Sequence, residues 1–286
     1  MPLTSRVTIL GPSGSGKSNF LRSFLFERRN EIHTAVVFSG SEGANAQWEA
    51  IFPRAYIYNE LDVNALERIL QRQTDVTQNA PDPKTGNQVS LIFDDLPEAD
   101  LRLPIMTKLF TKGRHYGIGI FVLIQFATMV PPAIRSNSNY VIVTQTQGED
   151  REKVYKTYFK ILGSMERFNL VMDHFCRNFG QLVFIKQAKA PTVEESVKWI
   201  RSKVITEPFT VGSREYWALD ELFTLPPSTR VVDWDKVRKS LAQGRASATQ
   251  THLAVESTPE LAACEMLDKH GRPMVEANQS VISARA

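Results

Sequence analysis

The chain has 286 residues, a formal net charge of +3, a pI near 8.8 and 42% hydrophobic residues. That length suits one large α/β domain or two small ones, and the apolar content is typical of a globular protein. No apolar run reaches the roughly 18 residues of a membrane span, and the first residues lack the regions of a secretory signal, so we expect neither membrane insertion nor secretion.

Cysteine usage and charge add little about function. Cys176 and Cys264 are the two cysteines, and neither lies at a metal-ligand spacing, so we expect ordinary reduced thiols inside a cell. Basic residues are spread along the chain, so the charge permits nucleic-acid binding without arguing for it.

The chain opens with a strand, a glycine-rich loop and a helix. Residues 6–10 form a short apolar run, and residues 19–29 have an apolar face at helical spacing. Between them, residues 11–18 read Gly-Pro-Ser-Gly-Ser-Gly-Lys-Ser and fill every fixed position of the P-loop, or Walker A, pattern. The strand and helix on either side favour a phosphate-binding loop over a chance Gly/Ser-rich turn.

Each part of this loop has an expected role in binding a nucleotide. Glycines let the backbone curl until its N–H groups point at the phosphates, and the helix that follows adds its positive end. We expect Lys17 to reach the β- and γ-phosphates and the Ser18 hydroxyl to ligate Mg²⁺. The residues predicted to contact the nucleotide are Gly11, Pro12, Ser13, Gly14, Ser15, Gly16, Lys17, Ser18 and Asn19.

Strand-like and helix-like segments alternate through about residue 203, which predicts an α/β fold with a mostly parallel sheet and helices on both faces. Strands are predicted at 6–11, 34–39, 55–58, 89–94, 118–126, 140–145 and 181–186. Helices are predicted at 17–29, 62–72, 101–113, 149–161, 164–177 and 192–203. We therefore expect a P-loop ATPase domain over residues 1–203.

Three segments depart from this alternation. Residues 73–88 are polar and rich in turn formers, which predicts an exposed loop. Residues 204–242, with a short amphipathic helix at 215–223, are expected to be an extension packed on the core. Residues 243–286 have few aromatic residues, and we expect a disordered tail.

A second motif ends the predicted strand at 89–94. Leu91-Ile-Phe-Asp-Asp95 is an apolar run followed by two acids, which is the form of the Walker B strand. We expect Asp94 to hold Mg²⁺ and Asp95 to polarise the attacking water. Asp95 has an alternative role as the cap of the next helix, and Glu98 is the reserve candidate for the base.

A third block runs from Lys112-Gly-Arg-His-Tyr-Gly-Ile-Gly through an apolar strand to Gln125, and continues with Pro131-Pro132, Ile134-Arg-Ser-Asn137 and another strand. It resembles the FtsK/HerA superfamily of DNA-pumping ATPases. Within that superfamily it is most similar to the poxvirus-type genome-packaging ATPases of large DNA viruses. The resemblance covers about residues 5–145 and continues more weakly to about 203.

The resemblance implies roles for several residues. Gln125 matches the sensor glutamine beside the γ-phosphate, although a glutamine at a strand end is often structural. Arg114 matches an arginine finger supplied to a neighbouring subunit; the alternatives are a cation at a helix end and Arg135 as the finger. His115 is expected to pack or hydrogen-bond. Asp95 stands where the family often has Glu, so a base there would have to sit closer to its water.

The resemblance also implies a function. We expect a RecA-like ATPase, using ATP and Mg²⁺, that forms a homo-oligomeric ring of five or six subunits and moves double-stranded DNA without regard to sequence. The implied task is packaging a viral genome, with a capsid or portal component as partner, in the host cytoplasm and the virion. Lys84 is a candidate DNA contact. A cellular segregation or conjugation motor, a monomeric P-loop kinase and a binding-only protein remain alternatives.

Overall fold

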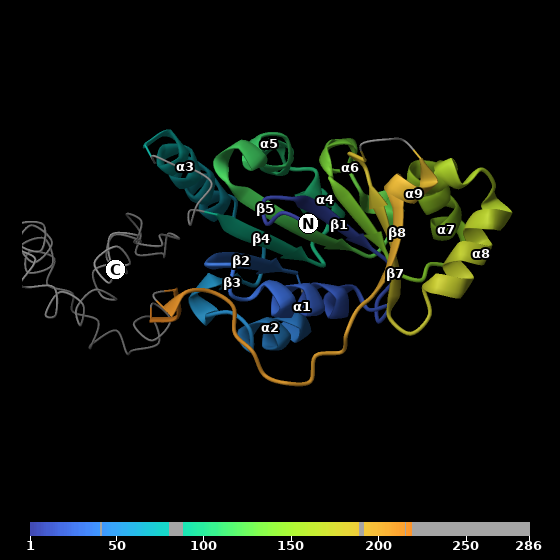
Figure 1. The fold of residues 1–286 in the computed structure, drawn as a ribbon. Coiled ribbons are helices and arrows are strands. Elements are labelled where there is room, and N and C mark those ends of the chain that lie inside the picture. Colours follow the sequence, from blue (N-terminus) through green and yellow to red (C-terminus); the bar gives the residue numbers. More distant parts are fainter. Residues whose placement is uncertain (41, 80–87, 189–191, 215, 219–286) are drawn as a thin grey trace, which may run out of the picture.

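A computed structural model describes residues 1–40, 42–79, 88–188, 192–214 and 216–218 of the chain. These residues form an eight-stranded sheet in the order β3-β2-β4-β5-β1-β6-β7-β8, with helices on both faces (Figure 1). The strands are β1 (Arg6–Leu10), β2 (Thr34–Ser39), β3 (Ile57–Tyr58), β4 (Val89–Asp94), β5 (Ile118–Ile124), β6 (Tyr140–Val143), β7 (Gly180–Ile185) and β8 (Val197–Arg201).

The helices form layers on the two sides of the sheet. They are α1 (Lys17–Arg28), α2 (Glu42–Glu49), α3 (Val63–Asn79), α4 (Glu98–Leu101), α5 (Pro104–Lys112), α6 (Pro132–Asn137), α7 (Gly148–Val154), α8 (Met165–Phe175) and α9 (Val193–Ser196). In Figure 1, α3 to α6 cover one face and α1 and α2 cover the other, while α7 to α9 lie at the β7 and β8 end. The predicted α/β fold is confirmed.

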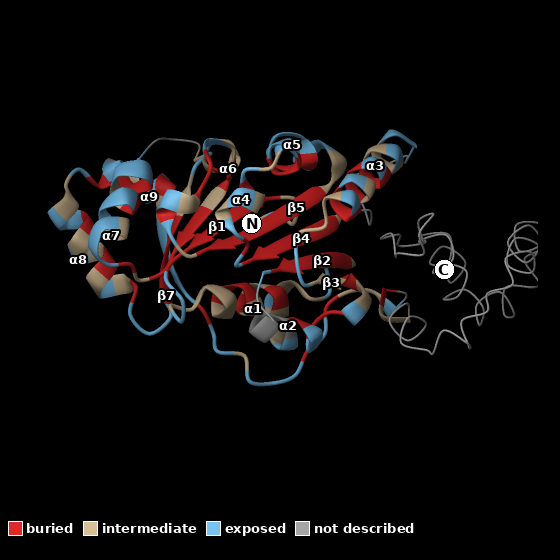
Figure 2. Cartoon of the chain, turned by 180° about the vertical axis from the view of Figure 1, so that it is seen from behind, coloured by how far each residue is buried: buried red, intermediate tan, exposed pale blue. Residues whose placement is uncertain are grey.

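The sheet is parallel from β3 through β6 and antiparallel where β7 pairs with β6 and β8. Every residue of β1, β4 and β5 is buried, because helices cover a parallel sheet on both faces (Figure 2). Since β1, β4 and β5 run in one direction, the loops that follow them meet at one edge of the sheet. This carboxyl edge holds the P-loop after β1, the acids at the end of β4, and Gln125 after β5.

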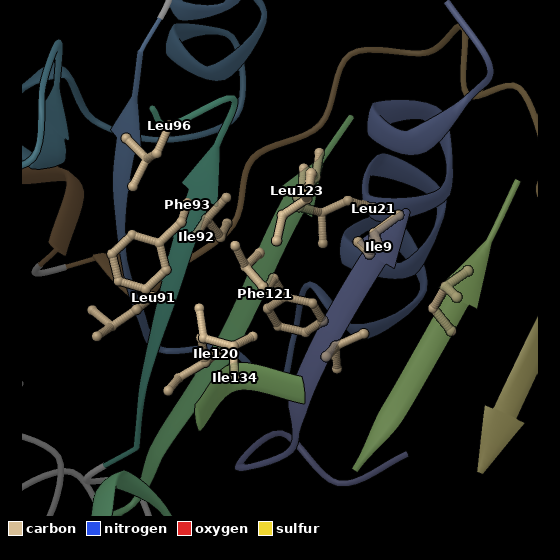
Figure 3. Close-up of a cluster of buried hydrophobic side chains, with 14 of the residues drawn as sticks. Ile9, Leu21, Leu91, Ile92, Phe93, Leu96, Ile120, Phe121, Leu123 and Ile134 are labelled. Atoms are coloured by element: carbon tan, nitrogen blue, oxygen red, sulfur yellow. The ribbon is translucent and has the colours of Figure 1, made fainter. Parts of the chain in front are cut away.

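The core lies around these central strands. Figure 3 shows Phe121 and Ile120 on β5, with Leu21 of α1 and Ile134 of α6 packed against the sheet. All four side chains are completely buried. Truncating a buried aromatic such as Phe121 to alanine typically costs about 3–5 kcal/mol of unfolding free energy. The strands that end at the carboxyl edge are therefore packed in a buried apolar core.

The helix predicted at 192–203 is wrong. Only Val193–Ser196 is helical, capped by the Thr192 hydroxyl, which accepts a hydrogen bond from the Glu195 N–H. The chain then enters β8, which pairs antiparallel with β7 from Phe184↔Val197 to Gly180↔Arg201. The free edge of β7 offers a row of backbone partners, and this pairing outweighs the local helical pattern.

Other predicted boundaries also moved. The helix predicted at 101–113 is α5, which begins at Pro104 because proline suits the first turn of a helix, while α4 ends at Leu101 and was not predicted. Residues 73–79, predicted as a loop, continue α3, while residues 80–87, including Lys84, lie outside the described residues. Helices α2 and α6 were not predicted. The helix predicted at 149–161 changes into a π-helical turn at Tyr155–Phe159.

The segment after β8 crosses α1 and returns to β2 (Figure 1). Phe209 packs edge-on against Phe26, the Val211 N–H donates to the Ile51 carbonyl, and the Tyr216 hydroxyl donates to the Ala35 carbonyl. Residues 215 and 219–286, which include most of the predicted helix at 215–223, the rest of the extension and the whole predicted tail, lie outside the described residues. Within the described ranges, no helix has the length and apolarity to cross a membrane.

Candidate active site

Residues 11–16 form a tight loop between β1 and α1. The Ser15 N–H and hydroxyl both donate to the Pro12 carbonyl, at 3.3 and 2.7 Å, and the Gly11 N–H donates to the Ile124 carbonyl at 3.2 Å. The Ser15 and Thr144 hydroxyl oxygens lie 2.6 Å apart, which links the loop to the end of β6. The loop is therefore held by both strands beside β1.

Steric contacts explain why two positions of this loop are occupied by glycine. A Cβ at Gly11 would lie 1.7 Å from the Thr144 hydroxyl oxygen, and one at Gly16 would lie 2.7 Å from the Phe179 ring. Gly16 also has a φ of 98°, a left-handed conformation that favours glycine, and it caps the N-terminus of α1. The helix presents its free N–H groups and positive end at this point, which suits an anion.

Lys17, the first residue of α1, folds over this loop. Its Nζ donates to the carbonyls of Gly11 and Pro12 at 2.7 and 3.0 Å. Burial lowers the pKa of Lys17, while the nearby carboxylates of Asp95 and Asp94 act in the opposite direction. The ammonium group thus lies between the loop and the two acids that end β4.

Asp94 is a buried carboxylate at the end of β4, only 4% exposed. Its Oδ2 accepts hydrogen bonds from Trp48 Nε1 at 2.9 Å and from Gln47 Nε2 at 3.5 Å. Burial raises the pKa of Asp94 and the Asp95 charge adds to that effect, whereas the Trp48 hydrogen bond and the Lys17 charge lower it. The indole stabilises the ionised form that a metal ligand needs.

Asp95 and Gln125 are joined by a hydrogen bond from Gln125 Nε2 to Asp95 Oδ1, at 2.5 Å. Asp95 has a φ of 54°, a left-handed conformation that Asp tolerates better than most residues. A Cβ at Gly40 would lie 2.4 Å from the Asp95 carbonyl oxygen, so glycine is needed beside this turn. The alternative that Asp95 caps the next helix is wrong: the N-cap of α4 is Pro97, and no side chain caps it.

These groups surround one cavity of about 290 Å³. Its lining consists of Ser13, Gly14, Gly16, Lys17, Ser18, Asn19, Gln47, Asp94, Asp95 and Gln125. The Asn19 Nδ2 atom is buried and has no hydrogen-bond partner in the structure. The carboxyl edge thus combines backbone N–H donors, one lysine and two carboxylates around a space large enough for phosphates.

The donor set fits a divalent cation that is shared with phosphates. The Ser18 hydroxyl and the Asp94 carboxylate both line the cavity, and Mg²⁺ prefers such oxygen ligands. The described residues contain no cluster of three or more His, Cys, Asp or Glu side chains that could hold a metal ion. Mg²⁺ typically keeps waters and substrate phosphates among its ligands, so two protein ligands suffice.

Two further candidates lie away from this cavity. Glu98, on α4, forms an exposed ion pair with Arg102 at 2.5 Å and does not line the cavity. Arg114 lies in a 3₁₀ turn, Gly113–Tyr116, that precedes β5, so it is at the amino edge of the sheet, opposite the P-loop. The structure does not bring Arg114 to the P-loop of its own chain.

The amino edge carries a second group of cations. Arg114 and His115 are exposed and line a cavity of about 750 Å³. The pKa of the buried Arg6 is lowered by burial and also by the Arg114 charge. Arg135, the competing finger, is half-buried on α6, where Lys186 Nζ donates to its carbonyl at 2.9 Å. No acidic side chain of the described residues forms an ion pair with Arg114 or Arg135.

Sequence reasoning missed Trp48, Thr144 and Phe179. Trp48 is fully buried although it lies in a polar stretch, and a lone tryptophan there is a weak signal for a buried partner. Thr144 follows an apolar strand and resembles any polar residue at a strand end. Phe179 precedes β7 by one residue, and nothing local indicates that its ring reaches the P-loop.

Comparison with known proteins places this site in context. A family model described as Poxvirus A32 protein matches residues 3–197. The chain is 32% identical over 182 residues to the uncharacterized protein 088R of Invertebrate iridescent virus 3, covering 62% of this chain and 68% of the relative. It is 27% identical over 218 residues to the uncharacterized protein 075L of Invertebrate iridescent virus 6, covering 74% and 83%.

A solved structure shares the fold at low sequence identity. It is the genome packaging NTPase B204 from Sulfolobus turreted icosahedral virus 2 in complex with ATP-gammaS, with a TM-score of 0.51 and 14% identity. The alignment covers 72% of this chain and 100% of B204. At this identity the likeness concerns the fold, and it agrees with the predicted P-loop architecture.

Proposed function

Because the chain belongs to the poxvirus A32 protein family, we propose that it is a viral genome-packaging ATPase that hydrolyses ATP with Mg²⁺ and moves double-stranded DNA into a capsid. The observation that carries the proposal is the convergence of Lys17, Asp94 and the Asp95–Gln125 pair on one cavity beside the P-loop. B204, a genome packaging NTPase with the same fold, supports it.

The residues of the cavity have separate tasks in this proposal. The P-loop N–H groups and Lys17 hold the phosphates, and Ser18 and Asp94 hold the metal ion. A bound Mg²⁺ would neutralise the charge that develops on the phosphates. Asp95 accepts a hydrogen bond from the attacking water, and Gln125 fixes the direction of the Asp95 carboxylate. Such catalysis rests on positioning and charge.

Arg114 acts on a neighbouring subunit in this proposal. It is exposed, has no ion pair among the described residues, and lies at the sheet edge opposite its own P-loop. An arginine so placed can reach a nucleotide only where another copy of the chain docks its carboxyl edge there. A ring of five or six subunits provides such an interface at every site.

Contacts with DNA and with the virion complete the proposal. DNA is held through its phosphates and without sequence preference, so binding weakens steeply as salt rises. A capsid or portal component is the expected partner, at the assembly site in the host cytoplasm and in the virion.

The test is the ATPase rate with and without long duplex DNA, across a range of protein concentrations. Stimulation by DNA together with a concentration threshold is the expected result, since the active site is completed by a neighbour. A rate that responds to neither variable would instead favour a monomeric P-loop kinase. As an independent check, the DNA-stimulated ATPase rate should fall as salt rises, with the same salt dependence as DNA binding.

A further inference from the structure

A second cavity, of about 610 Å³, adjoins the P-loop, and the proposed hydrolysis does not use it. It shares Ser13, Gly14 and Gln125 with the phosphate cavity described above. Its other walls include Pro12 and Ser15 of the P-loop, the exposed Phe126 after β5, the residues after β6, Asp150 of α7, and the turn between α8 and β7. A ligand whose phosphates occupy the P-loop would therefore extend directly into this space.

Phe179 presents an aromatic ring at this cavity. The side chain is 42% exposed, and the ring lies so close to Gly16 that a Cβ there would clash with it. Phe179 has a φ of 58°, a left-handed conformation that is a genuine outlier for a bulky side chain. Two hydrogen bonds fix the turn: the Gly180 N–H donates to the Arg177 carbonyl, and the Ser202 N–H donates to the Phe179 carbonyl.

A strained, half-exposed aromatic residue is not explained by core packing. Such conformations persist where the surrounding structure holds them, and they cluster at ligand sites. Here the turn keeps the ring beside the P-loop rather than in the core. Aromatic faces of this kind stack on the flat rings of nucleobases.

Thr146 supplies the polar counterpart. It is completely buried and lines the cavity, and its Oγ1 has no hydrogen-bond partner in the structure. Its carbonyl is engaged by Arg151 Nε at 2.7 Å, which fixes the backbone at this point. A buried hydroxyl without a partner is costly, and a ligand that hydrogen-bonds to it removes that cost. The Gln145 and Gln147 amides line the same wall and can both donate and accept.

We propose that this cavity binds the base of the nucleotide, with a purine ring stacked on Phe179 and its polar edge directed at Thr146. The inference rests on the proposed function, because it assigns the part of the ATP molecule that lies beyond the phosphates. An aromatic ring and a buried hydroxyl without a partner in one cavity match a flat heterocycle with hydrogen-bonding edges. No aromatic side chain of the described residues lines the phosphate cavity.

The test separates the base from the phosphates. Dissociation constants are measured by calorimetry with Mg²⁺ for ATP and for inorganic tripolyphosphate, which has no base. Phe179→Ala should weaken ATP binding about 5- to 100-fold, because stacking on an aromatic side chain contributes about that factor per base. Tripolyphosphate binding should stay unchanged, and Phe179→Tyr should bind ATP like the wild type.

Two further variants make the result specific. Thr146→Val keeps the shape and removes the hydroxyl, so ATP binding should weaken roughly 3- to 10-fold with no change for tripolyphosphate. Leu170→Ala is the control: Leu170 is a large apolar residue that is 72% exposed on α8 and does not line the cavity, so its loss should change neither constant. If Phe179→Ala does not fold, the dissociation constants of Thr146→Val for ATP and tripolyphosphate test the base site on their own.

Each remaining outcome has a distinct meaning. Equal weakening of both ligands by Phe179→Ala would show that the ring only shapes the P-loop, and the base site would be rejected while the proposed function stands. Unchanged ATP binding in both cavity variants would reject it as well. A wild-type protein that binds neither ligand would overturn the proposed function and this inference together.

Discussion

Gln125 Nε2 donates a hydrogen bond to Asp95 Oδ1 across 2.5 Å, although 30 residues separate the two in the chain. Asp95 directly follows β4 and Gln125 directly follows β5, and these two strands are parallel neighbours in the sheet. The hydrogen bond therefore depends on the register of β4 against β5. It also couples the candidate base to the candidate sensor, so that a change at one residue alters the direction of the other.

Replacing Asp95 with Asn should leave ATP·Mg²⁺ binding intact and slow hydrolysis by about 10²- to 10⁴-fold, the usual contribution of a general base. Asp94 and the P-loop remain, so the ligand contacts that hold the nucleotide are kept. Steady-state turnover and calorimetric binding measured on the same preparation check this. Glu98→Gln is the control, because Glu98 pairs with Arg102 outside the cavity and its loss should leave turnover near wild type. The reverse pattern would make Glu98 the base.

Replacing Lys17 with Ala should abolish hydrolysis and weaken ATP binding strongly. Lys17 is the only basic residue in the described part of the chain that lines the phosphate cavity, so the phosphates lose their only positively charged side-chain partner there. Binding of labelled ATP and release of phosphate are the measurements. Arg22, five residues along the same helix, is absent from that lining, so Arg22→Ala is a control that should bind and hydrolyse normally. If Lys17→Ala retained turnover, the assignment of residues 11–18 as the nucleotide-binding P-loop would be wrong.

Asp94→Asn should make the nucleotide-free protein more stable at neutral pH while it abolishes metal-dependent hydrolysis. Burial raises the pKa of Asp94, so the folded state disfavours the ionised form. The stabilising contribution of this group is present below the unfolded pKa of about 3.9 and is lost as the pH rises through the folded pKa. Removing the charge should therefore raise the melting temperature at pH 7. The difference should shrink near pH 4, where the wild-type carboxyl becomes protonated. A variant that is less stable than wild type at both pH values would contradict this.

Replacing Arg114 with Ala should preserve ATP binding and reduce turnover by about 10³- to 10⁵-fold, the contribution of an arginine finger. The decisive measurement mixes this variant with Lys17→Ala protein. Some interfaces then combine an intact P-loop from one variant with an intact arginine from the other, and partial activity should return. If Arg114→Ala alone keeps wild-type turnover, it is only a cation at a helix end, and Arg135→Ala is the next variant to measure.

The parts of the fold that could be predicted from the sequence depend on local patterns. The buried strand β1, the loop at 11–18 and helix α1 follow one another without interruption, and β4 ends at the acid that its apolar run indicates. Parallel strands buried on both faces read as apolar runs, so their positions were largely correct. The meeting of Asp94 and Gln125 at one edge follows from the parallel direction.

The parts that could not be predicted depend on contacts made across the fold. β8 has a helical pattern, but it pairs with the edge of β7. The Trp48 partner of Asp94 comes from α2, whose polar sequence gives no sign of a buried contact, and Phe179 reaches the P-loop only through the turn between α8 and β7. Which elements lie next to one another in the fold decides these contacts, and the residue types alone do not indicate them.

The hydrogen bond between Trp48 and Asp94 gives the protein an internal fluorophore at its candidate active site. The sequence has four tryptophans, and Trp48 is completely buried with its indole N–H on a carboxylate that would bind the metal ion. Indole emission responds to a nearby change of charge, so arrival of a cation at Asp94 should shift the spectrum without any attached dye. Stopped-flow recording of that signal would time the loading and emptying of each site, and Trp48→Phe would identify its source.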